Sequence, residues 1–325
     1  MQVLVMGAGA IGGYYGAALA RSGHDVTFVA RGAHLEALRE RGLAIRSGGA
    51  TTVLRPVRAV ATTTESRHAP DLVLFTVKGY DTDAAALALR PVVGAGTVVL
   101  TLQNGVDSVD RLAAALGLGP VLAGTTIIEA TIAEPGVIAQ GGPTPRIVIG
   151  EPSGGVTPRV EAVAAAFREA GVETVATPDA RQATWEKFVR LASNATVTAA
   201  CQATMGEVRA TPEGASLYRD LLSEAITVGR AAGAAFPADA VDTSLAFIWS
   251  LPHTMKTSMQ RDYERRGRVE LEELTGAVVR LGARVGVPTP TFDVTYRVLR
   301  ARALAFGGLG EGPRPATAGT GGSAT

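Results

Sequence analysis

A short apolar stretch near the amino terminus runs directly into a glycine motif. Residues 2–6 read QVLVM and residues 7–12 read GAGAIG, the pattern G-x-G-x-x-G at the point where a strand would give way to a helix. In this pattern Gly7 makes a tight turn, Gly9 lets the backbone approach a pyrophosphate, and Gly12 lets helix and strand pack closely. The helix amino terminus adds free N–H groups and a partial positive charge. We therefore predict a dinucleotide-binding loop, with a glycine turn that holds no ligand as the alternative. Its predicted cofactor-binding residues are Gly7, Ala8, Gly9, Ala10, Ile11 and Gly12.

A second strand is predicted at residues 25–30. The residue that follows this strand indicates which nucleotide would bind. An acidic residue about 20 positions after the glycine motif binds the ribose hydroxyls of NAD, whereas a basic residue accommodates the 2′-phosphate of NADP. That position is Arg31. A guanidinium can bind a phosphate through two parallel charge-assisted hydrogen bonds. We therefore predict NADPH, with an ordinary surface arginine as the alternative reading of Arg31.

Two later strands end in polar residues, where a doubly wound sheet places its ligands. Lys78 follows the strand at residues 71–77, and Asn104 follows the strand at residues 97–101. Lys78 could reach a cofactor phosphate or a substrate carboxylate. Asn104 could bond a ribose hydroxyl or a substrate oxygen, and a plain Asn-Gly turn is its alternative role.

A long helix predicted over residues 180–200 carries a lysine that could act as a proton donor. Its buried stripe has helical spacing, and Lys187 lies off that stripe. Asn194, seven residues later, returns to nearly the same side about 10 Å further along the axis. The two side chains could therefore face one cleft. The alternative for Lys187 is a solvated surface lysine.

Further along, Ser258 and Asp262 form an i, i+4 pair on one predicted helix face. Glu270 is predicted to open the next helix, after Gly267. Carboxylates in the first turn of a helix usually interact with the helix dipole, so that role is the alternative for Glu270.

The elements that must position these residues fall into two groups. Over residues 1–178 apolar strands alternate with helical patterns, which predicts an α/β, doubly wound, mainly parallel sheet of the Rossmann type that binds NADPH. Within it, residues 43–57 and 130–150 read as short antiparallel strands. Residues 179–306 lack strand signals, which predicts a second, all-helical domain. Its candidate residues Lys187 and Asn194 make it the expected substrate and catalytic domain. Residues 307–325 contain too few apolar side chains to offset the entropy cost of ordering, so we expect a disordered tail.

The overall composition excludes several classes of partner. Lys and Arg total 31 against 30 Asp and Glu, a net charge of +1, so neither nucleic acid nor an anionic membrane is expected. Cys201 is the single cysteine, which excludes an internal disulfide and favours a reducing compartment. The four histidines lack metal-ligand spacing, so no metal is predicted. With no signal peptide or membrane span in the pattern, we expect a cytoplasmic protein.

Considered together, these motifs have an order and approximate spacing that resemble one enzyme family over about residues 1–305. The motifs are Gly7–Gly12, Arg31, Val77-Lys78, Gln103-Asn104-Gly105, Trp185-Glu186-Lys187 and Ser258, Asp262, Glu270. The family is the ketopantoate reductases, or 2-dehydropantoate 2-reductases. The resemblance implies an oxidoreductase in which NADPH reduces the keto group of 2-dehydropantoate to give (R)-pantoate, on the route to pantothenate and coenzyme A.

The same resemblance implies roles for individual residues. Lys187 resembles the catalytic proton donor, and Glu270 resembles the catalytic carboxylate that binds the substrate's hydroxyl and also lies at the cofactor. Ser258 resembles the residue that holds the substrate carboxylate. Substrate-binding residues are then Asn104, Asn194, Ser258 and Asp262, and the cofactor-binding residues outside the glycine motif are Arg31, Lys78, Asn104 and Glu270.

The chain departs from the family pattern at two positions. Many members carry asparagines four and eight residues after the catalytic lysine, where this chain has Leu191 and Ala195. A less polar pocket would change which 2-oxo acid fits, so an NADPH-dependent reductase of another 2-oxo acid is the alternative function. A non-catalytic NADPH-sensing protein is a second alternative, although it would have no reason to keep Lys187, Ser258 and Glu270 together. A homodimer through the helical domain is the expected assembly, if there is one.

Overall fold

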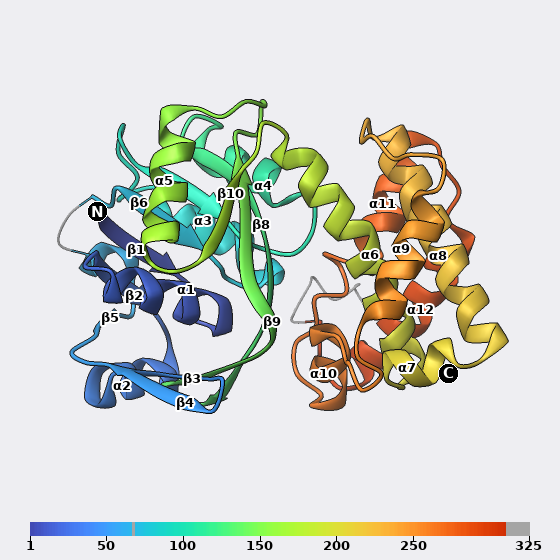
Figure 1. Ribbon diagram of the computed structural model, residues 1–325, viewed down its shortest axis with the longest axis horizontal. Helices are drawn as coiled ribbons and strands as arrows, with labels where there is room; N and C mark the ends of the chain where they lie inside the picture. The colour runs from blue at the N-terminus through green and yellow to red at the C-terminus, as the bar shows by residue number, and fades with distance from the viewer. Residues whose placement is uncertain (67–68, 310–325) are drawn as a thin grey trace, which may run out of the picture. The chain divides into compact units, whose positions relative to one another are not determined.

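The computed structural model describes residues 1–66 and 69–309, which divide into two compact units (Figure 1). The first unit comprises Met1–Val189 with Gly233–Ala235, and the second comprises Arg190–Ala232 with the described residues from Phe236 onward. The division falls inside helix α6 (Ala180–Cys201), whereas the sequence places the domain boundary at the start of this helix. The contacts made by the first half of α6 group it with the sheet, so Lys187 belongs to the first unit.

The described strands of the first unit form one ten-stranded sheet in the order β4-β3-β9-β8-β7-β6-β1-β2-β5, with β10 paired to β9. Adjacent strands run parallel except in the pairs β3–β4 and β8–β9, which confirms the mainly parallel sheet. The short edge strand β5 has no counterpart among the predicted strands. The strands are β1 (Gln2–Met6), β2 (Asp25–Val29), β3 (Leu43–Ser47), β4 (Ala50–Leu54), β5 (Arg58–Val60), β6 (Leu72–Phe75), β7 (Val98–Thr101), β8 (Val121–Glu134), β9 (Val137–Gly150) and β10 (Glu173–Ala176).

Helices cover both faces of this sheet because successive side chains of its strands point to opposite sides. In β1, Val3 and Val5 pack in one core cluster with residues of α1 and α5, while Leu4 and Met6 pack in another with residues of α3 and α4. This arrangement confirms the doubly wound fold. The helices of this unit are α1 (Ala10–Arg21), α2 (Gly32–Arg41), α3 (Thr82–Leu89), α4 (Ser108–Leu116) and α5 (Pro158–Glu169), with 3₁₀ turns η1 (Thr63–Glu65) and η2 (Gly79–Asp81).

The hairpin β8–β9 corrects one prediction. The sequence suggests short antiparallel strands within residues 130–150, but β8 and β9 each run for 14 residues. The first residues of β8 are buried and its last ones are exposed. A strand that leaves the core in this way loses its apolar signal midway, so its two ends look like separate elements.

In the described residues of the second unit every regular element is a helix, which confirms the predicted all-helical domain. The buried stripe predicted for α6, which extends from the first unit into the second, is also confirmed, with Trp185, Phe188, Val189 and Ala192 each 4% exposed or less. The other helices are α7 (Met205–Arg209), α8 (Pro212–Ala231), α9 (Ala240–Ser250), α10 (Ser258–Glu264), α11 (Thr275–Val285) and α12 (Pro290–Ala305).

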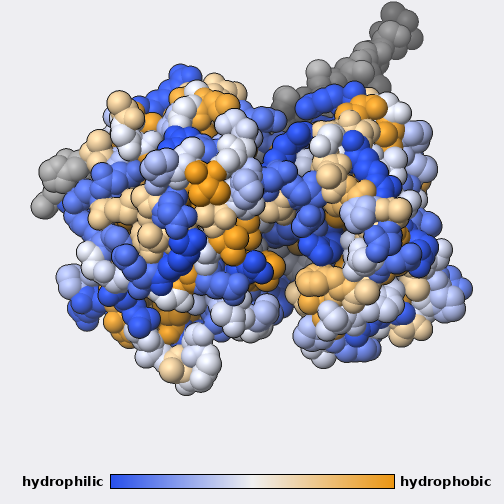
Figure 2. Space-filling view, turned by 45° about the horizontal axis from the view of Figure 1, so that its top comes forward, coloured by the Kyte–Doolittle hydropathy of each residue, from blue (hydrophilic) through white to orange (hydrophobic). Residues whose placement is uncertain are grey.

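Hydrophilic side chains predominate on the face of the molecule in Figure 2, with apolar side chains in small groups between them. Among the described residues, no helix has the length and apolar character needed to cross a membrane. Of the predicted disordered tail, residues 307–309 form the end of a turn and residues 310–325 lie outside the described residues.

Candidate active site

Two glycines of the motif are required by the protein's own packing. Gly7 has φ of +99°, and a Cβ there would lie 2.8 Å from the backbone nitrogen of Val77. A Cβ on Gly12 would lie 2.3 Å from both the carbonyl oxygen of Gly7 and Oγ1 of Thr76. Both contacts are shorter than carbon atoms tolerate, so any side chain at these positions would push β1, α1 and the end of β6 apart.

Gly9 is different, because nothing in the described protein requires it to be glycine. Its φ is −70°, which other residues adopt readily, and a Cβ there would meet no atom within 4 Å. Gly9 is also the N-cap residue of α1, and its helix has neither a side-chain cap nor an acidic residue in the first turn. Open space in front of an uncapped helix amino terminus suits a pyrophosphate. The glycine motif therefore fits the dinucleotide predicted from the sequence.

The polar residues Thr76 and Gln103 hold the neighbouring strand ends in place. Oγ1 of Thr76 donates to the carbonyl oxygen of Gly7 at 2.9 Å. The buried Gln103 donates through Nε2 to the carbonyl oxygen of Val77 at 2.9 Å and to Oγ1 of Thr82 at 2.8 Å. Sequence reasoning gave neither residue a role, although Gln103 directly precedes the predicted site residue Asn104.

Arg31 and Lys78 lie at the same edge of the sheet as the glycine motif, because β6, β1 and β2 are adjacent parallel strands. Arg31 is exposed and is the N-cap residue of α2. Lys78 is half-buried and precedes η2. Two cations at the carboxyl edge of three strands provide a positive environment for phosphate groups.

The predicted residues Lys187 and Asn104 are brought together within the first unit. Nζ of Lys187 donates to Oδ1 of Asn104 at 3.0 Å, and both side chains are half-buried. The bond orients the Asn104 amide so that its Nδ2 hydrogens point away from the ammonium and can donate to another oxygen. On α6, the rings of Trp185 and Phe188 pack edge to face with centroids 5.6 Å apart and anchor the turn that carries Lys187.

Asn194 has a structural partner in the second unit. Its side chain is 6% exposed, and its Oδ1 accepts a hydrogen bond from the Tyr218 hydroxyl at 2.7 Å. Tyr218 in turn packs edge to face on Trp249, with ring centroids 5.2 Å apart. The acceptor end of Asn194 therefore ties α6 to α8, and its Nδ2 hydrogens are the part suited to bind a ligand.

Ser258 and Asp262 lie in α10 as predicted, Ser258 exposed and Asp262 half-buried. The prediction for Glu270 is wrong in one respect, because Glu270 does not open a helix. It lies in an irregular segment after α10, and α11 begins only at Thr275. Gly276 donates its backbone N–H to the carbonyl oxygen of Leu271, so a turn intervenes before the helix. The helix-dipole alternative does not apply to Glu270, whose carboxyl is nevertheless buried, at 4% exposure.

The departures from the family pattern also lie in α6. Ala195 is fully buried and Leu191 is half-buried. At these two positions α6 thus presents apolar side chains where many family members have amides.

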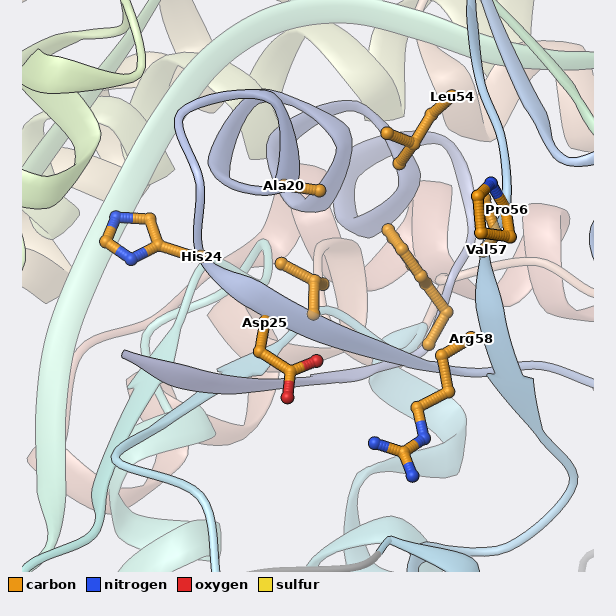
Figure 3. A pocket seen from close by; sticks show the side chains of 9 residues that line it. Ala20, His24, Asp25, Leu54, Pro56, Val57 and Arg58 are labelled. Carbon is orange, nitrogen blue, oxygen red and sulfur yellow. The ribbon is translucent and has the colours of Figure 1, made fainter.

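A cavity of about 410 Å³ lies at the other end of the sheet from the glycine motif (Figure 3). It is lined by residues that include Asp25 at the start of β2, Arg58 at the start of β5, and the apolar side chains Leu54 and Val57. These are the amino ends of the strands, whereas nucleotides bind at the carboxyl ends. This cavity is therefore separate from the predicted cofactor site. Among the described residues no group of three or more His, Cys, Asp or Glu is arranged to hold a metal ion.

Comparison with known proteins identifies the family. The family model described as "Ketopantoate reductase PanE/ApbA" matches residues 3–154, and that described as "Ketopantoate reductase PanE/ApbA C terminal" matches residues 179–303. The 2-dehydropantoate 2-reductase of Halobacterium salinarum is 36% identical over 305 residues, which cover 92% of this chain and 98% of that protein.

Solved structures agree with this result. The PanE/ApbA family ketopantoate reductase from Ralstonia eutropha JMP134 superimposes with a TM-score of 0.86 at 32% identity, covering 94% of this chain and 99% of that one. A D-mandelate dehydrogenase solved with NADH and anilino(oxo)acetate has a TM-score of 0.87 at 20% identity over 94% of this chain and 99% of its own, which shows a shared fold alone. From its sequence matches along nearly the whole chain, we conclude that this protein belongs to the ketopantoate reductase family and is an oxidoreductase.

Proposed function

We propose that this protein catalyses the NADPH-dependent reduction of 2-dehydropantoate to (R)-pantoate, a step towards pantothenate and coenzyme A, with Lys187 as the proton donor. The observation that carries the proposal is the hydrogen bond between the Lys187 ammonium and Asn104 at 3.0 Å, in the unit that also holds the glycine motif. NADPH rather than NADH is favoured by Arg31 at the end of β2.

The residues that would hold the cofactor are the backbone of residues 7–12, Arg31, Lys78 and Asn104. A bound nicotinamide dinucleotide would supply the hydride that reduces the substrate's keto carbon. Lys187 then has two tasks: its ammonium stabilises the negative charge that develops on the keto oxygen, and it donates the proton that completes the hydroxyl group. The neutral amine left behind regains a proton from solvent. Asn104 keeps the ammonium in one orientation throughout.

For the substrate, we propose that Glu270 accepts a hydrogen bond from the hydroxyl group of 2-dehydropantoate and that Ser258 binds its carboxylate. We further propose Glu270 as a cofactor-site residue, and Asn194 and Asp262 as additional substrate-binding residues. The burial of Glu270 supports its role, because a buried carboxylate strongly favours a ligand that can donate a hydrogen bond to it.

Reduction of a different 2-oxo acid is the second candidate function. The observation that favours it is the apolar character of α6 at Leu191 and Ala195. Replacing amide side chains by apolar ones removes hydrogen-bond partners for a polar substrate and favours a less polar acid on the same catalytic residues. A protein that senses NADPH without catalysis is disfavoured, because it would not need Lys187, Ser258 and Glu270 together.

A panel of 2-oxo acids tests the proposal. The purified protein is mixed with NADPH or NADH and each acid in turn, and nucleotide oxidation is followed by absorbance. We expect the highest kcat/KM for 2-dehydropantoate with NADPH. A higher value for another 2-oxo acid selects the second candidate, and no turnover with any acid, despite NADPH binding, selects the sensing protein.

We also propose that the protein works in the cytoplasm and that its helical unit mediates homodimer formation. Val294 and Val298, one turn apart on α12, are 54% and 51% exposed, and Leu304 near the end of this helix is 54% exposed. Neighbouring exposed apolar side chains such as Val294 and Val298 can form the contiguous apolar patch that marks a protein–protein contact. Light scattering of the wild-type protein and of a Val298→Glu variant tests this: a dimer that the variant dissociates is expected, and a monomeric wild-type protein contradicts it.

A further inference from the structure

His34 connects three segments of the first unit. It is in the first turn of α2, three positions after Arg31. Its Nδ1 accepts a hydrogen bond from the backbone N–H of Gly136, in the turn between β8 and β9, at 3.1 Å. The backbone carbonyl of Ala8, in the glycine motif, also acts on the ring and raises its pKa, although burial has the larger effect and lowers it.

The bond to Gly136 determines the protonation of the ring. An amide N–H can only donate, so Nδ1 must be unprotonated and the proton of the neutral imidazole is on Nε2. The Nε2 atom is buried and has no hydrogen-bond partner within the described residues. Burial lowers the pKa of His34, which favours this neutral form.

Gly136 itself is tightly fitted against α2. It has φ of +84°, and a Cβ there would lie 3.0 Å from Cβ of Ala37 on α2. Its carbonyl oxygen accepts a hydrogen bond from the backbone N–H of Ala44 at 2.9 Å, and Arg41 donates to the carbonyl oxygen of Pro135 at 3.2 Å. The turn therefore provides a fixed support for α2, and His34 is the contact nearest to the helix's amino end.

We propose that His34 is a positioning residue for the nucleotide, which fixes the amino end of α2, and with it Arg31, relative to the glycine motif. This inference rests on the proposed function. The pyrophosphate at residues 7–12 and the 2′-phosphate at Arg31 belong to one ligand, so its affinity depends on how well the spacing of these two segments is maintained. Proton transfer from Lys187 does not depend on that spacing once the nucleotide is bound.

Two variants separate the hydrogen bond from the bulk of the ring. His34→Asn places an amide oxygen where Nδ1 stands and can still accept from Gly136, whereas His34→Leu keeps an apolar side chain and loses the acceptor. We expect His34→Leu to raise both the Kd for NADPH, measured by fluorescence titration, and the KM for NADPH by at least about tenfold, with kcat within about twofold of wild type. His34→Asn should stay within about threefold in all three quantities.

His24→Leu is the matched control. His24 is also half-buried, also accepts at Nδ1, from the N-terminal amine at 3.2 Å, and also has a buried Nε2, but it lines the cavity at the opposite end of the strands. It should leave NADPH binding unchanged. An unchanged Kd for NADPH in His34→Leu overturns the inference. So does a Kd for NADPH that rises as much in His34→Asn as in His34→Leu.

A ring-nitrogen NMR experiment on the wild-type protein without nucleotide tests the hydrogen bond directly, even where His34→Leu fails to fold. We expect the Nε2-protonated tautomer, and a proton on Nδ1 overturns the inference. The proposed function fails separately, if the wild-type protein binds neither NADPH nor NADH.

Discussion

The side-chain oxygen of Asn104 accepts a hydrogen bond from the Lys187 ammonium at 3.0 Å, although 83 positions separate the two residues in the chain. Asn104 follows β7, where Gly105 has φ of +104° and allows a turn that few other residues could make. Lys187 projects from a helix that is anchored by its buried aromatic stripe. A flexible lysine is thereby held in one place, which general acid catalysis requires.

Gly9 and Gly12 should respond differently to alanine. Gly9→Ala should fold with unchanged stability but weaken NADPH binding by at least about tenfold, because its Cβ would enter the open space in front of α1. Gly12→Ala should lower the free energy of unfolding by about 1–3 kcal/mol, because its Cβ would overlap Gly7 and Thr76. Thermal melts and NADPH titrations of both variants are the measurements. Wild-type NADPH affinity in Gly9→Ala contradicts a nucleotide at this loop.

Arg31→Ala should weaken NADPH binding by at least about tenfold and NADH binding by less than about threefold, because the 2′-phosphate is the group that distinguishes the two nucleotides. Arg39→Ala, in the last turn of the same helix, is the control and should change neither. Equal affinities of the wild-type protein for the two nucleotides would remove Arg31 from cofactor selection.

Glu151 should make the stability of the first unit sensitive to acid. Hydrogen bonds from Arg159, with the largest effect, and from Thr157 lower the pKa of its carboxyl below the ordinary value of 4.5. A lowered folded-state pKa contributes stability that is fully present above pH 4.5 and is lost as the pH falls through the folded value. When the pH is lowered below about 4.5, the melting temperature of the wild type should therefore fall by more than the melting temperature of Glu151→Gln.

Arg159→Ala should lower the free energy of unfolding at pH 7 by about 2 kcal/mol, since it leaves the Glu151 carboxylate, 7% exposed, without its cation. The loss stays below that for a fully buried pair because the Arg159 side chain is 35% exposed. If the melting temperatures of the wild type and Glu151→Gln depend on pH in the same way, the Glu151–Arg159 ion pair does not govern acid stability.

Glu270 should control substrate choice. If the substrate is 2-dehydropantoate, the analogue that lacks its 4-hydroxyl group should be reduced at least about tenfold less efficiently, because it cannot donate the hydrogen bond that we propose the buried Glu270 accepts. Glu270→Ala should reduce this discrimination together with kcat/KM, while Glu264→Ala, an exposed carboxylate of α10, should change neither. A wild-type enzyme that handles both acids equally well rules out the pantoate assignment and favours a 2-oxo acid suited to Leu191 and Ala195.

Features that depend on local sequence were predictable. The glycine motif, the parallel strands around it, and the buried stripe of α6 all follow from spacing within about 20 residues. The full length of β8 was not predictable, because the second half of this strand leaves the core and loses its apolar pattern. Nor was the start of α11, where an intervening turn separates the helix from Glu270.

Hydrogen bonds between residues that are far apart in the chain could not be predicted from the sequence either. Residue type and local position indicate Asn104, Lys187 and Asn194 as site residues, but no spacing rule pairs Asn104 with Lys187 or Asn194 with Tyr218. Likewise His34 lacked metal-ligand spacing, and only the fold brings it to Gly136. Such pairs depend on how the elements pack, which a local pattern does not encode.

The most direct test of the account is the turnover number of Lys187→Ala with NADPH and the best 2-oxo acid of the wild-type enzyme. General acid catalysis and stabilisation of the developing alkoxide together predict a fall in kcat of at least about a hundredfold, with the Kd for NADPH within about threefold of wild type. Lys256→Ala, a lysine paired with Glu264 on the surface, is the control and should retain full activity. A Lys187→Ala enzyme that turns over within about threefold of the wild-type rate contradicts the central claim that Lys187 donates the proton.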